Sequence, residues 1–375
     1  MNISEKQMSS FITTTWKLPE VTSNPSIQHW LFDDEPNHPN FVISWCSGTY
    51  SCKYMVFSTG DKDWQKFENW ALIHPVDDFE VFLNHNNGGL GRHPLLVGDI
   101  RLYRMSPELS RIVFVTGETG SKLQELAYAD LFFDHTIDAF YILAPPTKMN
   151  IDHEMGSRHQ KNWSPFAFSY TSFPDMKPHL ANMFIYSVHP HRIVFTNESE
   201  PNFSYDMKKV HTVAVTDYAH MGHESKPIWD YGEPRGGTPA ILVDTKYGKK
   251  YLTVFHSQCH CMASWCLTYF MGAYLFDPEP PFAVTHISPE PIVPLPLYDE
   301  RNGWAYKTID YIVFPTGLLA LGDFLLLTVG RNDNSGWVVV MHKDRLVDSL
   351  LPVRSSVTEN RFNRHSYYTL SGEVR

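Results

Sequence analysis

A short segment past the middle of the chain combines a cation with residues that let the main chain approach a ligand closely. Arg235-Gly-Gly-Thr-Pro-Ala240 precedes an apolar run that ends in Phe255-His256-Ser257. Adjacent glycines allow close approaches that side chains would block. A guanidinium binds phosphate or carboxylate through two parallel hydrogen bonds. The segment indicates an anion-binding loop, with a glycine turn beside a solvated arginine as the alternative.

Other polar residues have types suited to acid–base chemistry and to binding. Asp99 stands in Gly98-Asp-Ile-Arg101, where it could donate a proton or pair with Arg101 in a turn. Lys161-Asn162-Trp163 places a second cation beside an amide, or a surface lysine beside a core tryptophan. Three more candidates stand near turns: Asn24 and Ser26 on either side of Pro25, and Asp333 after an apolar run.

A metal site is the rival interpretation of one cluster. Zinc binds thiolate and imidazole. The available ligands are His256, Cys259, His260, Cys261 and Cys266. However, Cys259-His-Cys261 lacks the two-residue gap of ordinary zinc knuckles, and no second cysteine pair lies near. Idle or buried thiols are therefore favoured, and we expect neither a metal nor a cofactor.

The elements that must position these residues are short strands. Runs of four to six β-branched and aromatic residues are separated by turn residues throughout the chain. They include Phe41–Trp45, Lys53–Phe57, Arg111–Val115, Met183–Ser187, Tyr251–Phe255, Phe324–Thr328 and Trp337–Met341. Only Ser121–Tyr128 and Lys343–Leu350 are candidate helices, and the first could equally approach a strand. This pattern predicts a closed all-β architecture. A pair of strands followed by a loop recurs about five times, which favours a propeller.

Composition limits the classes of partner. The 375 residues carry a net charge of −10 without a basic run, which argues against a nucleic-acid partner. No apolar stretch is long enough to span a membrane, and the first residues lack the apolar core of a signal peptide. Five cysteines, an odd number, suit a reducing compartment, so we expect a cytoplasmic protein.

Five segments, taken in order, carry a resemblance to known families. They are Asn24-Pro-Ser-Ile27, Gly98-Asp-Ile-Arg101, Lys161-Asn-Trp-Ser-Pro-Phe166, the Arg235 loop through His256, and Phe314-Pro-Thr-Gly317 with Gly330-Arg-Asn-Asp333. The series resembles the β-mannoside phosphorylases of glycoside hydrolase family 130 and the related β-1,2-mannosyltransferases of glycosyltransferase family 108. The resemblance implies a five-bladed β-propeller with one central active site. We therefore expect one domain over residues 1–375, with a core of about 24–353 and peripheral ends.

The resemblance also implies roles for single residues. Asp99 would be the general acid, although Gly98 and Ile100 replace the family's usual Glu and Pro. Lys161, Arg235 and His256 would bind phosphate or a phosphorylated donor. Five residues would hold the sugar: Asn24, Ser26, Arg101, Asn162 and Asp333.

The expected activity is an inverting mannosyl transfer that makes or phosphorolyses β-mannosides, with β-1,2 the expected linkage. Partners would be an oligosaccharide or mannose acceptor together with phosphate, mannose 1-phosphate or GDP-mannose. Two family cations are missing: Thr116-Gly-Glu-Thr-Gly120 and Ser44-Trp-Cys-Ser-Gly48 carry none. That departure leaves room for a nucleotide-sugar donor or for hydrolysis, with Glu118, Glu233 or Asp230 as candidate bases. A noncatalytic glycan-binding propeller is the remaining alternative.

Overall fold

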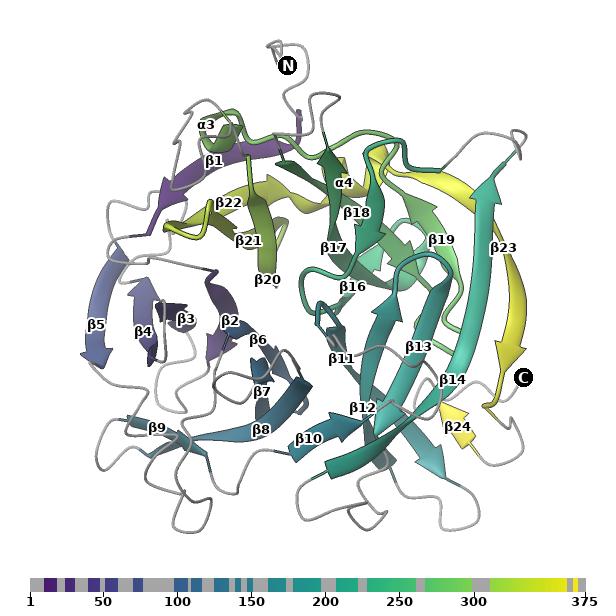
Figure 1. The fold of residues 1–375 in the computed structure, drawn as a ribbon, viewed down its shortest axis with the longest axis horizontal. Helices are drawn as coiled ribbons and strands as arrows, with labels where there is room; N and C mark the ends of the chain where they lie inside the picture. Colours follow the sequence, from purple (N-terminus) through teal and green to yellow (C-terminus); the bar gives the residue numbers. More distant parts are fainter. Residues whose placement is uncertain are drawn as a thin grey trace.

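The structure is a computed structural model of the chain, and its strands surround a common centre (Figure 1). It describes residues 10–18, 24–30, 40–47, 51–59, 70–76, 98–106, 109–116, 125–134, 139–142, 147–150, 161–172, 178–196, 207–221, 228–260, 267–298, 311–362 and 367–369. Nearly all of the described elements are strands, so the predicted all-β class is confirmed. Among the described residues, no helix is both long enough and apolar enough to cross a membrane.

Two of the sheets have four antiparallel strands each. One contains β2 (Ser26–Trp30), β3 (Asn40–Ser47), β4 (Ser51–Thr59) and β5 (Trp70–Val76). The other contains β1 (Ile12–Lys17), β22 (Ser335–His342), β21 (Phe324–Arg331) and β20 (Val313–Leu321). Because β1 pairs with β22, this second sheet joins the two ends of the chain and closes the arrangement.

The remaining strands form one continuous sheet of sixteen. They are β6 (Gly98–Arg104), β7 (Ser110–Thr116), β8 (Glu125–Asp134), β9 (Ala139–Ile142), β10 (Thr147–Asn150), β11 (Ser164–Ser172), β12 (Pro178–Ser187), β13 (His191–Thr196), β14 (Met207–His220), β15 (Glu233–Arg235), β16 (Ile241–Thr245), β17 (Gly248–His260), β18 (Leu267–Phe276), β19 (Val284–Ile287), β23 (Leu351–Asn360) and β24 (Tyr367–Thr369). The long strand β14 links three antiparallel groups, because it pairs with β13, with β10 and with β23. Two short helices, α3 (Leu295–Tyr298) and α4 (Lys343–Ser349), complete the described elements.

The innermost strands of different sheets touch one another. In Figure 1, β2, β6, β11 and β20 lie nearest the centre. Strand β6 contacts β2, β11 and β20, and β20 also contacts β16 and β17. Residues at the same end of these strands are therefore neighbours although they are far apart in sequence.

Apolar side chains fill the spaces between adjacent sheets. One cluster joins β17 and β18 to β20–β22 through residues such as Val254, Met271 and Leu327. A second joins β11–β14 to β17 and β18 through Phe166, Ile193 and Phe255. These clusters fix how the sheets sit against one another, and thus where their inner ends meet.

Most element predictions are confirmed, with corrections at the chain ends. The seven predicted strands all lie within described strands, and Lys343–Leu350 contains α4. Within Ser121–Tyr128, the described part from Glu125 is strand β8. The segments near the two chain ends, which were expected to be peripheral, both pair with other strands. Strand β1 completes a sheet and places Phe11 and Ile12 in the core, and β23 pairs with both β14 and β19.

Candidate active site

Asp99 lies at the start of β6, on a main chain with an unusual conformation. Its φ is 50°, and the register of β6 against β7 shifts between Gly98 and Arg101. Asp and Asn are the residue types that tolerate left-handed φ best after glycine. The irregularity turns the carboxylate away from the regular strand pattern. Its Oδ1 accepts a hydrogen bond of 3.1 Å from Asn24 Nδ2.

Arg101 is fully buried and holds the main chain around Asp99. Its Nη1 donates to the main-chain oxygen of Asp99 at 2.8 Å, and its Nε donates to that of Gly237 at 2.6 Å. Among the described residues, no ion pair joins its guanidinium to the Asp99 carboxylate. Burial lowers the pKa of Arg101, and the negative charge of Asp99 opposes that shift. Arg101 therefore acts here as a brace between β6 and the loop after Arg235.

The anion-binding loop predicted from the sequence lies beside Arg101. Arg235 ends β15, and its Cα is the register partner of that of His256 on β17. The Arg235 guanidinium is partly exposed and forms an ion pair of 2.9 Å with Glu233. Exposed pairs of this kind are weak, so a competing anion can displace Glu233.

His256, the third residue expected to bind phosphate, is buried. Its Nδ1 lies 2.9 Å from the carbonyl oxygen of Gly236, which can only accept, so Nδ1 carries the proton. Burial is the largest cause, the charge of Arg101 adds to it and the Gly236 hydrogen bond opposes it, and together they lower the pKa of His256 to about 3. His256 is therefore neutral near pH 7, and its Nε2 is a hydrogen-bond acceptor.

Lys161 comes to the same place from the segment before β11. The charges of Lys161 and Arg235 both contribute to lowering the pKa of His256. The two segments meet through their main chains: a Cβ on Gly236 would lie 1.9 Å from the carbonyl oxygen of Asn162. Asn162 is itself buried with φ 68°.

A second carboxylate, Asp333, belongs to the same group. It lies in the turn between β21 and β22, and both it and Asn332 have positive φ, 49° and 50°. Asp333 is exposed at the surface, yet its partial burial raises its pKa. The charge of Asp99 raises it further, and Lys161 opposes the shift. Asp99, Asp333 and Lys161 thus share one electrostatic environment.

Two aromatic residues at this site were missed by sequence analysis. Tyr269 on β18 stacks on His256 with ring centroids 5.3 Å apart, and Phe314 on β20 packs edge-on at 4.6 Å. Burial raises the pKa of Tyr269. Arg235 opposes this shift, whereas Asp333 and Asp99 add to it. Tyr269 stands in β18, which is rich in aromatic residues, so no local signal marks it. Phe314 opens the segment Phe314-Pro-Thr-Gly317 of the resemblance, but it was given no role at the site.

Ser26 is the predicted site residue whose hydroxyl is already engaged. It is fully buried, accepts from the main-chain N–H of Leu102 at 2.9 Å, and donates to the carbonyl oxygen of Thr316 at 3.2 Å. These bonds tie β2 to β6 and β20. Ser26 therefore positions the inner strands of three neighbouring groups.

The rival residues are placed less favourably. Glu118, Cys261 and Cys266 lie outside the described residues. Glu233 is occupied by Arg235, and Asp230 is exposed. In the part of the chain that the structure describes, no group of three or more His, Cys, Asp or Glu side chains is arranged to hold a metal.

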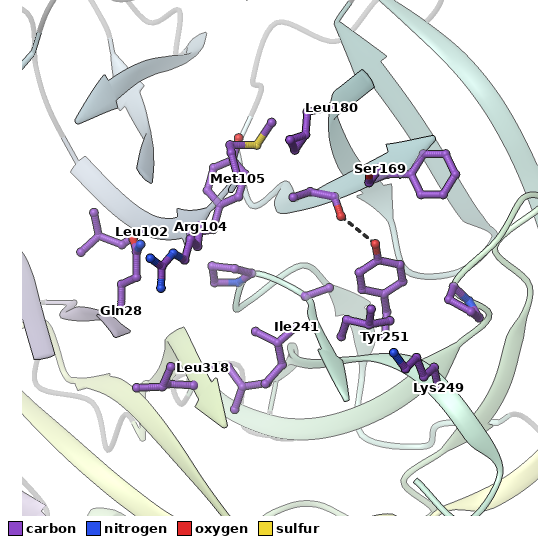
Figure 2. A pocket seen from close by; sticks show the side chains of 18 of the residues that line it. Gln28, Leu102, Arg104, Met105, Ser169, Leu180, Ile241, Lys249, Tyr251 and Leu318 are labelled. Atoms are coloured by element: carbon purple, nitrogen blue, oxygen red, sulfur yellow. Dashed lines mark hydrogen bonds between the residues drawn. The ribbon is translucent and has the colours of Figure 1, made fainter. Parts of the chain in front are cut away.

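A separate cavity of about 600 Å³ opens toward the other end of the inner strands. Its lining includes Gln28, Leu102, Arg104, Tyr251 and Leu318 (Figure 2). Along β2, β6 and β20 these residues follow the site residues, and on β17 Tyr251 precedes His256. The lining contains none of the candidate site residues. The cavity is thus distinct from the charged cluster around Asp99.

Comparisons with known proteins show that this chain resembles solved structures in its fold. No protein-family model matches the chain, and no curated protein matches it significantly. A protein from Bacteroides thetaiotaomicron assigned as a glycosidase has a TM-score of 0.50 and 15% identity, over 90% of this chain and 94% of that chain. One from Parabacteroides distasonis assigned as a glycoside hydrolase has a TM-score of 0.50 and 13% identity, over 86% of each chain.

A further solved structure comes from a study of family 130. That study describes the family of mannoside phosphorylases as containing glycoside hydrolases that target β-1,2-mannosidic linkages in Candida mannan. The structure has a TM-score of 0.48 and 14% identity, over 85% of this chain and 84% of that chain. The solved structures that this chain resembles thus include a member of family 130, the family named from the sequence. The chain shares its overall fold with solved structures assigned to the glycoside hydrolases.

Proposed function

We propose that this protein is an inverting mannosyl-transfer enzyme that makes or phosphorolyses β-mannosides, with β-1,2 as the linkage. One observation carries the proposal. A carboxylic acid, Asp99, lies in the same electrostatic environment as two cations, Lys161 and Arg235, and as the neutral imidazole of His256. An acid beside an anion pocket is what transfer between a sugar and a phosphorylated donor requires.

The proposal includes the architecture. We propose a single propeller domain of five blades over residues 1–375, with β2, β6, β11, β15–β16 and β20 as the inner strands. The contacts among inner strands and the closure of the ring by β1 and β22 support it. A cytoplasmic location stays a prediction.

In the proposed reaction the β-glycosidic bond breaks while phosphate attacks the opposite face of the sugar. The electron pair of the C1–O bond passes to the departing oxygen, which takes a proton from Asp99 directly or through a sugar hydroxyl. A phosphate oxygen forms the new bond to C1, which gives α-mannose 1-phosphate. The reverse direction uses mannose 1-phosphate as the donor and releases phosphate, whereas synthesis from GDP-mannose would release GDP.

The pocket favours a particular state of the anion. Lys161 and Arg235 supply positive charge, whereas His256 Nε2 offers a lone pair. That nitrogen accepts a hydrogen bond from a P–OH group of monohydrogen phosphate or from a sugar hydroxyl. Asn162 and Asp333 stand beside Lys161 and are proposed to hold the mannose.

Hydrolysis is the second candidate, because the structure brings a second carboxylate into the environment of Asp99. The raised pKa of Asp333 suits a base that activates water. A phosphorylase and a hydrolase differ in whether phosphate is needed for bond cleavage.

The test is to incubate the protein with β-1,2-mannobiose, with and without phosphate, and to follow the products by NMR. In separate reactions mannose is supplied with mannose 1-phosphate or with GDP-mannose. Phosphate-dependent α-mannose 1-phosphate, or oligomannoside from either donor, supports the proposal. Free α-mannose without phosphate supports hydrolysis. Binding of mannobiose with no turnover under any condition would support a noncatalytic glycan-binding protein and overturn the proposal.

A further inference from the structure

The amide of Asn24 is clamped between two other residues of the site. On one side its Nδ2 donates to Asp99 Oδ1 at 3.1 Å. On the other side lies Gly330 of β21, at which a Cβ would come within 1.8 Å of Asn24 Oδ1 and 2.9 Å of its Cγ. We infer that Asn24, seated in the space left by Gly330, is a positioning residue that orients the carboxyl group of the proposed general acid Asp99.

The orientation of the amide follows from chemistry. An ionised carboxylate only accepts hydrogen bonds, so the NH₂ group of Asn24 must face Asp99. The opposite end, Oδ1, is buried and has no hydrogen-bond partner among the described residues. A buried polar atom without a partner costs free energy. The Nδ2 of Asn24 therefore keeps its hydrogen bond to Asp99, while its Oδ1 has none among the described residues.

Asp99 is then held at two points. Arg101 holds its main-chain oxygen at 2.8 Å, and Asn24 holds one carboxylate oxygen. Among the described residues, no protein hydrogen bond engages the other oxygen, Oδ2. A carboxyl group fixed in this way presents Oδ2 to a departing oxygen without a search among rotamers, and such preorganisation raises the rate of proton transfer.

This role differs from the sugar contact that the sequence suggested for Asn24. A sugar ligand would help every substrate that carries the same mannose. A residue that orients the acid matters only when the departing oxygen needs a proton. The two roles are separated by the leaving group, and the inference rests on the proposed function.

The first experiment compares two substrates in wild type and Asn24→Ala. β-1,2-Mannobiose has a poor leaving group that requires protonation, whereas 2,4-dinitrophenyl β-mannoside releases a stable anion. We expect kcat/KM of Asn24→Ala to fall about 10- to 100-fold with mannobiose and less than about threefold with the dinitrophenyl substrate. An equal loss with both substrates would overturn the inference and restore a sugar-binding role.

The second experiment tests whether Gly330 acts through Asn24. Gly330→Ala should reproduce the pattern of Asn24→Ala, because its methyl group displaces the amide. In the Asn24→Ala background, the same methyl group meets mainly the Cα of residue 24 at 3.0 Å, a contact that a small shift relieves. The Gly330→Ala change should then cost less than about threefold further, which is strong coupling between the two sites. Additive losses in the double variant would contradict the clamp.

The outcomes separate this inference from the proposed function. Wild type that converts neither substrate, with or without phosphate, overturns both. Wild type that converts them while Asn24→Ala shows no dependence on the leaving group overturns the inference alone. Circular dichroism and thermal unfolding verify the fold of each variant. If Gly330→Ala does not fold, Asn24→Ala and the double variant still decide the question.

Discussion

Arg235 and His256 are register partners across β15 and β17, yet only the arginine carries charge near pH 7. The imidazole stays neutral because it is buried and because the positive charges of Arg101, Arg235 and Lys161 lower its pKa. In the proposed function, a neutral imidazole beside two cations would recognise both negative charge and a hydroxyl group. This combination distinguishes the site from a simple cluster of positive charges.

We expect Asp99→Asn to leave the fold intact and to reduce mannosyl transfer by about 10²- to 10⁴-fold. Asn has nearly the same size as Asp but cannot supply a proton, and positioned acid catalysis has this magnitude. The rate with β-1,2-mannobiose and phosphate is the measurement, with circular dichroism as the control. Retention of more than about a tenth of the wild-type rate would remove Asp99 from the mechanism.

Lys161→Ala and Arg235→Ala should each raise the KM for phosphate or the sugar phosphate by about tenfold or more, because each removes a charge-assisted hydrogen bond. The melting temperature should change little, since both side chains are exposed or partly exposed. Lys246→Ala is the matched control: Lys246 is an exposed lysine paired with Asp348 and is not among the site residues. A KM unchanged in both site variants would show that the anion binds elsewhere.

Gly236→Ala should impair both stability and donor binding. The added Cβ would lie 1.9 Å from the carbonyl oxygen of Asn162, so the Arg235 loop and the Lys161 segment would have to move apart. We expect a loss of more than about 2 kcal/mol in the free energy of unfolding, as for other overpacked core sites. Gly322→Ala is the control, with open space around its Cβ and only a left-handed φ of 55°. It should cost about 1 kcal/mol.

Because two histidines are buried, we expect the folded protein to lose stability in acid. Burial lowers the pKa of His191 to about 3, and His256 has a similar value. Between about pH 6.5 and 3 the unfolded chain binds protons that the folded chain does not. The free energy of unfolding therefore falls as pH falls, by up to about 1.4 kcal/mol per pH unit for each histidine.

Denaturant unfolding between pH 7.5 and 4 measures this dependence. His191→Leu should make the curve shallower, because one of the two proton-binding differences is removed. It should leave the stability at pH 7.5 nearly unchanged, since Leu suits a position beside Tyr274 and Phe276. A curve as steep as that of wild type would show that His191 is not responsible.

The local pattern of residues determined the strands. Runs such as Tyr251–Phe255 and Trp337–Met341 are rich in β-branched or aromatic residues and are bounded by turn residues, so their preference for strand can be read locally. The same sequence also supplied the chemical types at the site: one acid in a turn, a lysine beside an amide, and an arginine before two glycines. The strand role of residues 12–17 was missed because their partner, β22, lies more than 300 residues away in sequence.

Only the tertiary structure decided which of these residues meet and in what state. Asn24 reaches Asp99 across 75 positions of sequence because β2 and β6 are neighbours at the centre. Ser26 stands only two residues away, but it is buried, because its hydroxyl bonds to Leu102 of β6 and to Thr316 of β20. His256 is chemically an ordinary histidine, and its burial beside cations keeps it neutral. Proximity, burial and charge environment are properties of the assembled sheets, and no single segment contains them.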